Sequence, residues 1–216
     1  MCRIFTLVIS LCAGISTCAC LEMPRFNSLG KFTPPEQVAF EVRHYEPAVA
    51  IETETSEKER GGAFMRLAGY IGVGSSPQNT RKEGISMTSP VVSSMNLDSK
   101  SPMTDMQFVL PQSLFGGNVD KAPVPSFADV HVMQRPARNM AVYTFSGSWS
   151  ESEYAEKVKQ LCNSVEKMQQ DDSGFGWKVK SPLVSETYRY NSPWTLAFMR
   201  TNEVAVELEK KTEEAQ

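Results

Sequence analysis

The sequence predicts an α+β domain in which two copies of a strand–strand–helix–strand–strand unit share one curved sheet. Short stretches alternate between apolar and polar residues, which is typical of strands. Two longer stretches carry apolar residues at helical spacing, and the same order of elements occurs twice. Equivalent positions lie about 90 residues apart, as Ala50 and Ala141 or Pro90 and Pro182 show.

The first copy of the unit contains four strand-like segments around one helix-like segment. In the helix-like segment, Phe64, Leu67 and Ile71 are spaced i, i+3, i+7, so they share one face of a helix. The five segments cover residues 40–44, 48–53, 62–71, 91–92 and 106–110.

The second copy repeats this order with a longer helix. Ser150 and Glu153 form a capping box at the start of that helix. Its apolar face carries Tyr154, Val158, Leu161, Val165 and Met168. The segments cover residues 130–133, 140–145, 151–168, 183–184, 186–190 and 204–208. Because each helix has a single apolar stripe, it must cover a sheet. We therefore expect an open barrel with both helices outside and a cleft between helix and sheet.

The N-terminal 20 residues have the composition of a targeting signal. Arg3 precedes the apolar run 4–15, and small residues follow at 16–20. A run of 12 residues is too short to span a bilayer comfortably, so we expect cleavage after Cys18 or Cys20 and no membrane span afterwards. The alternatives are an uncleaved anchor and a bipartite organellar signal. The predicted location is extracytoplasmic or the lumen of an organelle, with plastids included.

The remaining boundaries follow from composition. Residues 21–37 are rich in proline and lack a period, which predicts a partly disordered connector. Residues 209–216 are mostly charged and form a predicted tail, so the globular domain covers 38–208.

Composition excludes several functional classes. The net charge is −3 and no basic run is present, so nucleic acid is not an expected partner. The chain has two histidines and, beyond the leader, a single cysteine, Cys162. These counts argue against a structural zinc site and exclude an internal disulfide framework. The sequence contains no Gly-x-Ser-x-Gly motif, and Cys162 lies within the predicted helix. We expect a monomeric binding protein rather than an enzyme.

Three residues in the first half are candidates for a ligand site. His44 shares a strand face with Phe40 and Val42, so it could ligate haem iron or be a half-buried histidine bonded to a backbone carbonyl. Met65 suits a flat apolar ligand, although methionines in such a pattern are more often core residues. Arg66 could pair with porphyrin carboxylates or be a solvated surface cation.

Several motifs together resemble one known family. They are FEVRHYEPA at 40–48, GYIG at 69–72, ISMTSPV at 85–91, YRYNSP at 188–193 and RTNEV at 200–204. In this order and spacing they resemble the SOUL haem-binding family over residues 38–208. The resemblance implies a distorted barrel of eight or nine strands with two flanking helices. It also implies reversible binding of haem or another tetrapyrrole in an apolar groove between the first helix and the sheet.

The resemblance further implies particular site residues. The loop 192–200 would supply Trp194, Leu196 and Phe198 as apolar contacts and Arg200 as a propionate partner. His44 falls where some members of the family carry a proposed axial histidine. The favoured function is a non-catalytic tetrapyrrole carrier or buffer. A promiscuous small-molecule binder and an enzyme acting on a bound ligand are the alternatives.

Overall fold

The computed structural model describes residues 21–96, 104–147, 150–172 and 174–211. In these residues ten strands form one antiparallel, curved sheet in the order β1-β2-β7-β10-β9-β4-β5-β3-β6, with β8 beside β10. The strands are β1 (Phe26–Phe32), β2 (Phe40–Tyr45), β3 (Ala48–Thr55), β4 (Val91–Asn96), β5 (Thr104–Val109), β6 (His131–Arg135), β7 (Arg138–Phe145), β8 (Trp177–Val179), β9 (Val184–Arg189) and β10 (Asn202–Lys210). The α-helices are α1 (Arg60–Ile71), α2 (Gln112–Phe115) and α3 (Glu151–Asp171).

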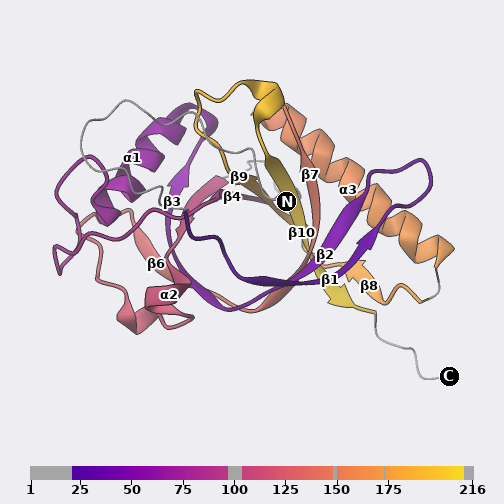
Figure 1. The fold of residues 1–216 in the computed structure, drawn as a ribbon, viewed down its shortest axis with the longest axis horizontal. Helices are drawn as coiled ribbons and strands as arrows, with labels where there is room; N and C mark the ends of the chain where they lie inside the picture. Colours follow the sequence, from indigo (N-terminus) through magenta and orange to yellow (C-terminus); the bar gives the residue numbers. More distant parts are fainter. Residues whose placement is uncertain (1–20, 97–103, 148–149, 173, 212–216) are drawn as a thin grey trace, which may run out of the picture.

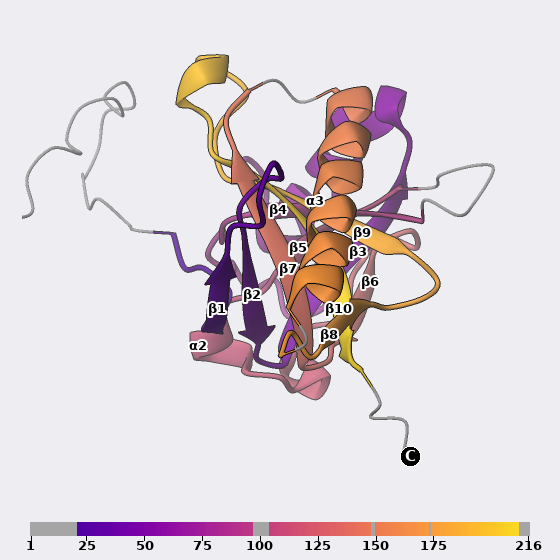
Figure 2. The same cartoon turned by 90° about the vertical axis from the view of Figure 1, so that its right-hand side faces the viewer.

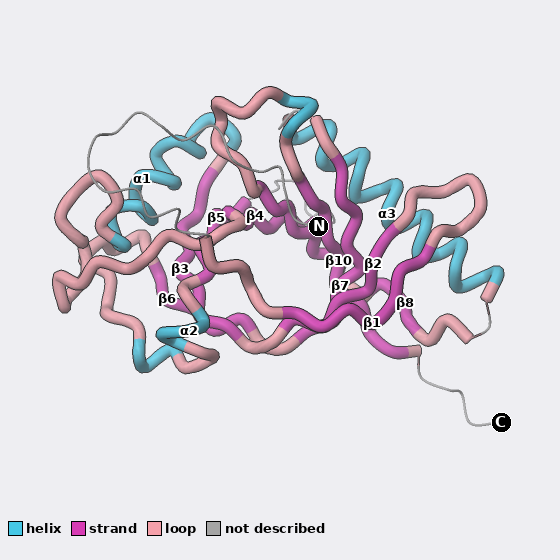
Figure 3. Tube along the Cα trace, viewed as in Figure 1, coloured by secondary structure: helices cyan, strands magenta, loops and turns pink. Residues whose placement is uncertain are grey.

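The α+β open barrel is confirmed. The sheet curves around a central space and is not closed, and α1 and α3 lie outside it on opposite sides (Figures 1 and 3). The strand order reads symmetrically about the β4–β9 pair, with β5, β3 and β6 on one side and β10, β7 and β2 on the other. Ser94 pairs with Glu186 at this centre, close to the spacing that the repeat predicts.

Helix α1 forms and ends as the sequence predicts. It packs Ala63, Leu67 and Ile71 onto the sheet in one buried cluster with Val49, Ile51 and Phe108 of β3 and β5. At its end Gly72 adopts a positive φ of 84°, which favours glycine because it has no Cβ. The interface between α1 and the sheet is therefore filled by side chains, and the groove expected there is replaced by packed core.

Helix α3 covers the other half of the sheet (Figure 2). The predicted cap is present, since the Glu153 amide donates to the Ser150 hydroxyl at 3.3 Å and that hydroxyl donates to the Glu153 carboxylate at 2.6 Å. Its apolar stripe packs against strands β7, β8 and β10 and belongs to one buried cluster with them. The buried members of this cluster include Phe40, Val42, Ala141, Tyr154, Val158, Leu161, Val165, Val204 and Val206.

The Pro-rich segment 21–37 is more ordered than expected. Residues 26–32 form β1 and pair with β2, because the prolines at 24, 34 and 35 flank this strand and leave its ladder hydrogen bonds intact. At the other end β10 continues to Lys210, supported by the ion pair of Lys178 with Glu209 at 3.1 Å. The predicted leader, 1–20, lies outside the described residues.

Candidate functional site

The β9–β10 loop, residues 190–201, exposes a group of large apolar side chains. Trp194 is 93% exposed and Phe198 is 75% exposed, and Leu196 and Met199 are exposed beside them. The loop stands at the top of Figure 1, next to the start of α3. Covering apolar side chains of this size lowers the free energy of the protein in water. A group of them left exposed is therefore typical of a binding surface.

The shape of this loop depends on Arg200. Its Nε donates to the Thr195 carbonyl at 2.7 Å and its Nη2 donates to the Pro193 carbonyl at 2.9 Å. Residues 197–199 form a short 3₁₀ turn within the loop. The predicted propionate partner therefore also holds the apolar side chains in place.

Positive charge gathers at the same end of the molecule, around the Tyr154 hydroxyl. Burial raises the pKa of Tyr154, while the positive charges of Arg189, Arg60 and Arg200 lower it in part. The Arg189 guanidinium lies 5.0 Å from the centre of the Tyr154 ring. Arginines from the start of α1, the end of β9 and the end of the loop thus act on one hydroxyl, which donates at 3.3 Å to Asn202, directly after the loop. This convergence is a tertiary feature, which sequence reasoning missed.

The predicted α1 residues point elsewhere. The Arg66 guanidinium lies 2.8 Å from the Asp129 carboxylate, and it donates to Thr53 at 3.1 Å and to the Glu54 carbonyl at 2.9 Å. Arg66 therefore ties α1 to β3 and to the segment before β6. Met65 is 62% exposed and makes no part of the core. Phe64 is partly exposed and stacks edge-on against Phe108 at 5.3 Å between ring centres.

His44 lies far from the β9–β10 loop. It shares the outer sheet face with Phe40 and Val42, as the alternation predicts, and its Nδ1 is 2.8 Å from the side-chain oxygen of Asn139. Asn139 pairs with His44 at one end of β7, whereas Phe145 at the other end pairs with the first residue of β10. Six residues of strand separate the two positions, which corresponds to roughly 20 Å. The structure does not bring His44 together with Trp194, Leu196, Phe198 and Arg200.

The inner face of the sheet carries a buried polar network that sequence reasoning also missed. The Glu186 carboxylate accepts hydrogen bonds from both Nη atoms of Arg138 at 2.6 and 2.8 Å. It also accepts one from Arg135 Nη2 at 2.7 Å and one from the Tyr188 hydroxyl at 2.8 Å. The alternation of Glu186 and Tyr188 on β9 with Tyr190 directly after it was the available signal, because alternate residues share one face.

A second network lies beside the first. The Glu203 carboxylate accepts two hydrogen bonds from Arg43 at 3.0 Å each, and one from the Tyr190 hydroxyl at 2.6 Å. Arg43 also donates to the Tyr45 hydroxyl at 3.2 Å. Burial raises the pKa of Tyr45 to about 12 and that of Tyr188 well above its ordinary value. Both hydroxyls are therefore protonated at neutral pH.

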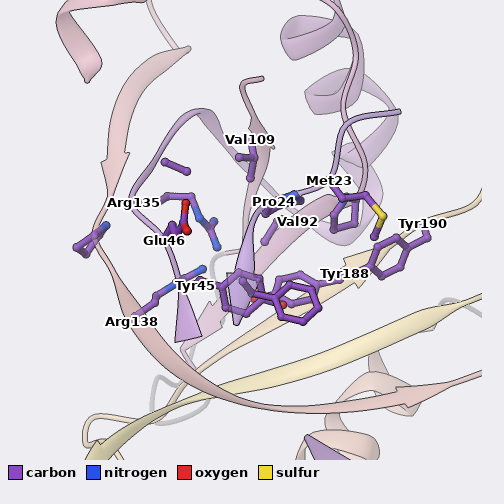
Figure 4. A pocket seen from close by; sticks show the side chains of 14 residues that line it. Met23, Pro24, Tyr45, Glu46, Val92, Val109, Arg135, Arg138, Tyr188 and Tyr190 are labelled. Carbon is purple, nitrogen blue, oxygen red and sulfur yellow. The ribbon is translucent and has the colours of Figure 1, made fainter. Parts of the chain in front are cut away.

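A small cavity of about 30 Å³ lies inside the barrel (Figure 4). Its walls include Tyr45, Tyr188, Arg135 and Arg138, and Met23 lies across its mouth. This volume holds about two water molecules. A drug-sized ligand needs a pocket of roughly 300–1,000 Å³, so a porphyrin does not fit here as the structure stands.

The described part of the chain lacks two further kinds of feature. It contains no group of three or more His, Cys, Asp or Glu side chains that could hold a metal ion. Within the same residues, no helix has the length and apolar character needed to cross a membrane.

A family model described as SOUL heme-binding protein matches residues 21–207. The chain belongs to this family. The match begins at residue 21, so it includes β1 and the segment that crosses the mouth of the barrel. The resemblance drawn from the sequence motifs is confirmed.

Curated relatives agree with this assignment. The chain is 28% identical to heme-binding protein 2 of Mus musculus over 188 residues, which covers 85% of this chain and 84% of the relative. It is 27% identical to heme-binding protein 2 of Homo sapiens over 174 residues, covering 79% and 78% of the two chains. An uncharacterized conserved protein from Listeria innocua superposes with a TM-score of 0.50 at 10% identity, over 82% of this chain and 94% of that one. This last likeness concerns the fold alone.

Proposed function

We propose that the protein is a non-catalytic carrier or buffer that binds haem or another tetrapyrrole reversibly at the β9–β10 loop. The supporting observation is the exposed apolar surface of Trp194 and Phe198 beside converging arginines. A tetrapyrrole such as haem has a flat apolar body and two carboxylates. The loop offers apolar contact to the body, and the positive potential of Arg60, Arg189 and Arg200 favours the carboxylates.

Two other locations, the interface between α1 and the sheet and the cavity inside the barrel, fit a tetrapyrrole less well. The interface between α1 and the sheet is filled by side chains such as Leu67, and the barrel cavity is too small. On α1, Phe64 packs against Phe108 of β5, whereas the Met65 side chain is exposed. Arg66 forms an ion pair with Asp129, in the segment before β6. Arg60 and Arg189 therefore replace Arg66 in the proposed site.

Binding in this site does not use His44 as an iron ligand. His44 lies roughly 20 Å from the loop along β7 and is hydrogen-bonded to Asn139. Affinity then comes mainly from apolar contact and from the arginines.

A role without catalysis agrees with the chemistry of Cys162, the single cysteine beyond the leader. Burial raises the pKa of the Cys162 thiol to about 11, so the nucleophilic thiolate is scarce at neutral pH. The thiol is half-buried on α3, in contact with the apolar cluster under that helix.

Titration with haemin, followed by absorbance, tests the proposal. We expect saturable binding, and weaker binding of the haemin dimethyl ester, whose carboxylates are blocked. Replacing Arg189 with Gln should reduce the difference between the two ligands. Equal affinity for haemin and its ester in the wild type would remove the arginines from the site. Absence of saturable haemin binding would contradict the function itself.

We also propose that residues 1–20 direct the chain to the secretory route or to an organelle lumen. The support is the order of charge, apolar run and small residues. Mass spectrometry of the native protein should find an N-terminus near Ala19 or Leu21. Recovery of a Met1 or Cys2 peptide from most molecules would contradict this.

A further inference from the structure

We propose that the barrel interior is a second ligand site, which takes a small organic carboxylate with an apolar body and which residues 21–25, the closing segment, cover. This site is separate from the β9–β10 loop and does not depend on tetrapyrrole binding. It is built from the cavity and the polar network behind it.

The charged groups around the cavity favour an anion. Arg135 and Arg138 line it, whereas Glu186, which pairs with both, lies behind them. The Glu186 carboxylate already accepts four hydrogen bonds, so it has little capacity left for a cationic ligand. Arg138 holds Glu186 end-on with one N–H of each Nη, so further N–H groups of its guanidinium remain as donors for a ligand. A ligand carboxylate can accept a charge-assisted hydrogen bond from these remaining N–H groups.

The charges on neighbouring elements do not reverse this preference. Glu203 is nearby, but Arg43, Thr144 and Tyr190 engage its carboxylate, and it does not line the cavity. Glu46, which does line it, is an exposed residue at the mouth. A ligand inside therefore meets guanidinium groups before it meets a carboxylate.

The rest of the wall is apolar and partly aromatic. The rings of Tyr45 and Tyr188 lie edge-to-face with their centres 6.3 Å apart. Arg43 and Glu186 engage their hydroxyls, so the rings are the surfaces that they offer to a ligand. Val92 and Val109 complete this side. Such a wall suits the body of an aromatic or short aliphatic acid.

The closing segment holds the cavity at its present size. Met23 and Pro24 line the mouth, and Figure 4 shows both beside Tyr188 and Tyr190. Met23 is nevertheless 49% exposed, so its burial contributes only part of its apolar area to stability. A ligand larger than about two water molecules must displace the Met23 side chain.

Polar contacts at its edges fix the closing segment. The Ser89 amide donates to the Glu22 carbonyl at 3.0 Å, and the Arg25 amide donates to the Gln112 side chain at 2.7 Å. The Glu22 carboxylate accepts from the Ser113 amide at 2.9 Å and from the Ser113 hydroxyl at 2.5 Å. These contacts leave the Met23 side chain as the part of the segment that a ligand has to move.

Calorimetric titration of the full chain with benzoate tests this proposal, and Met23→Ala is the deciding variant. Removing the side chain from the mouth should tighten benzoate binding about tenfold relative to the wild type, which corresponds to ~1.4 kcal/mol. Val124→Ala, which shortens an exposed apolar side chain elsewhere, should leave the affinity unchanged. Benzylamine, with a similar body and the opposite charge, should not bind measurably.

The outcomes separate the two sites. Saturating haemin should leave benzoate binding to Met23→Ala unchanged, and competition would place benzoate at the loop and overturn the proposal. Equal benzoate affinities of Met23→Ala and Val124→Ala would show that Met23 does not close a site. Preference for benzylamine would overturn the assignment of an anion. Failure of both variants to bind benzoate at millimolar concentration would overturn the site altogether.

Discussion

Replacing Trp194 and Phe198 together with Ala should weaken haemin binding about 30-fold. The two side chains are 93% and 75% exposed, so nearly all of their surface is open to a ligand. An aromatic side chain buries ~150–250 Å² when fully covered, and a flat ligand covers one face, so roughly 90 Å² and 70 Å² would be lost. At ~25 cal/mol per Å² this is ~4 kcal/mol. Ordering the two side chains on binding costs about 2 kcal/mol of this apolar contribution. The remaining ~2 kcal/mol corresponds to the stated factor.

The assay is an absorbance titration with haemin, run beside a matched control. Leu114→Ala with Val124→Ala removes two exposed apolar side chains away from the loop, and this variant should bind like the wild type. Circular dichroism should show the same fold for all three proteins, because neither pair belongs to a buried cluster. If the loop variant and the control bind haemin equally well, the β9–β10 loop is not the tetrapyrrole site.

Three other predictions concern single residues. His44→Ala should leave the Soret band of the haemin complex in place and lower stability by ~1 kcal/mol through loss of the bond to Asn139, and a shifted band would instead place iron at His44. Leu161→Ala should lower the free energy of unfolding in urea by ~3 kcal/mol, because Leu161 is fully buried under α3, and a loss below ~1 kcal/mol would contradict that packing. Burial and the negative charge of Glu54 raise the pKa of Asp105 despite a hydrogen bond from Ser94, so the ionised form destabilises the fold. Asp105→Asn should therefore be slightly more stable than the wild type at pH 7 in thermal melts, and the difference should vanish in acid, where Asp105 is protonated folded and unfolded.

The regular elements could be predicted because their periods are visible in the sequence. The stripe that contains Tyr154 and Leu161 marks α3, and the alternation around Val42 marks β2. β1 was missed because its residues show no clear alternation and stand among prolines. The short strand β8, Trp177–Val179, offers too few residues for a period.

The functional surfaces depend on contacts that no local pattern contains. On β2 the polar alternate position Arg43 suggests a solvent-facing side chain, yet it is buried against Glu203, 160 residues away. Arg60 and Arg189 meet at Tyr154 only because the fold brings α1, β9 and α3 together. For His44, the alternation predicted the correct face of the sheet. It does not predict how far His44 lies from the loop along the strands.

The symmetric strand order has a consequence for the independence of the two halves. The first strand of each repeat leaves its own half, since β2 pairs with β7 and β6 pairs with β3. Each half thus supplies an edge strand to the other half, as in a domain-swapped dimer. A chain cut near residue 127, between the repeats, should yield fragments that do not fold alone and that reconstitute the barrel when they are co-expressed.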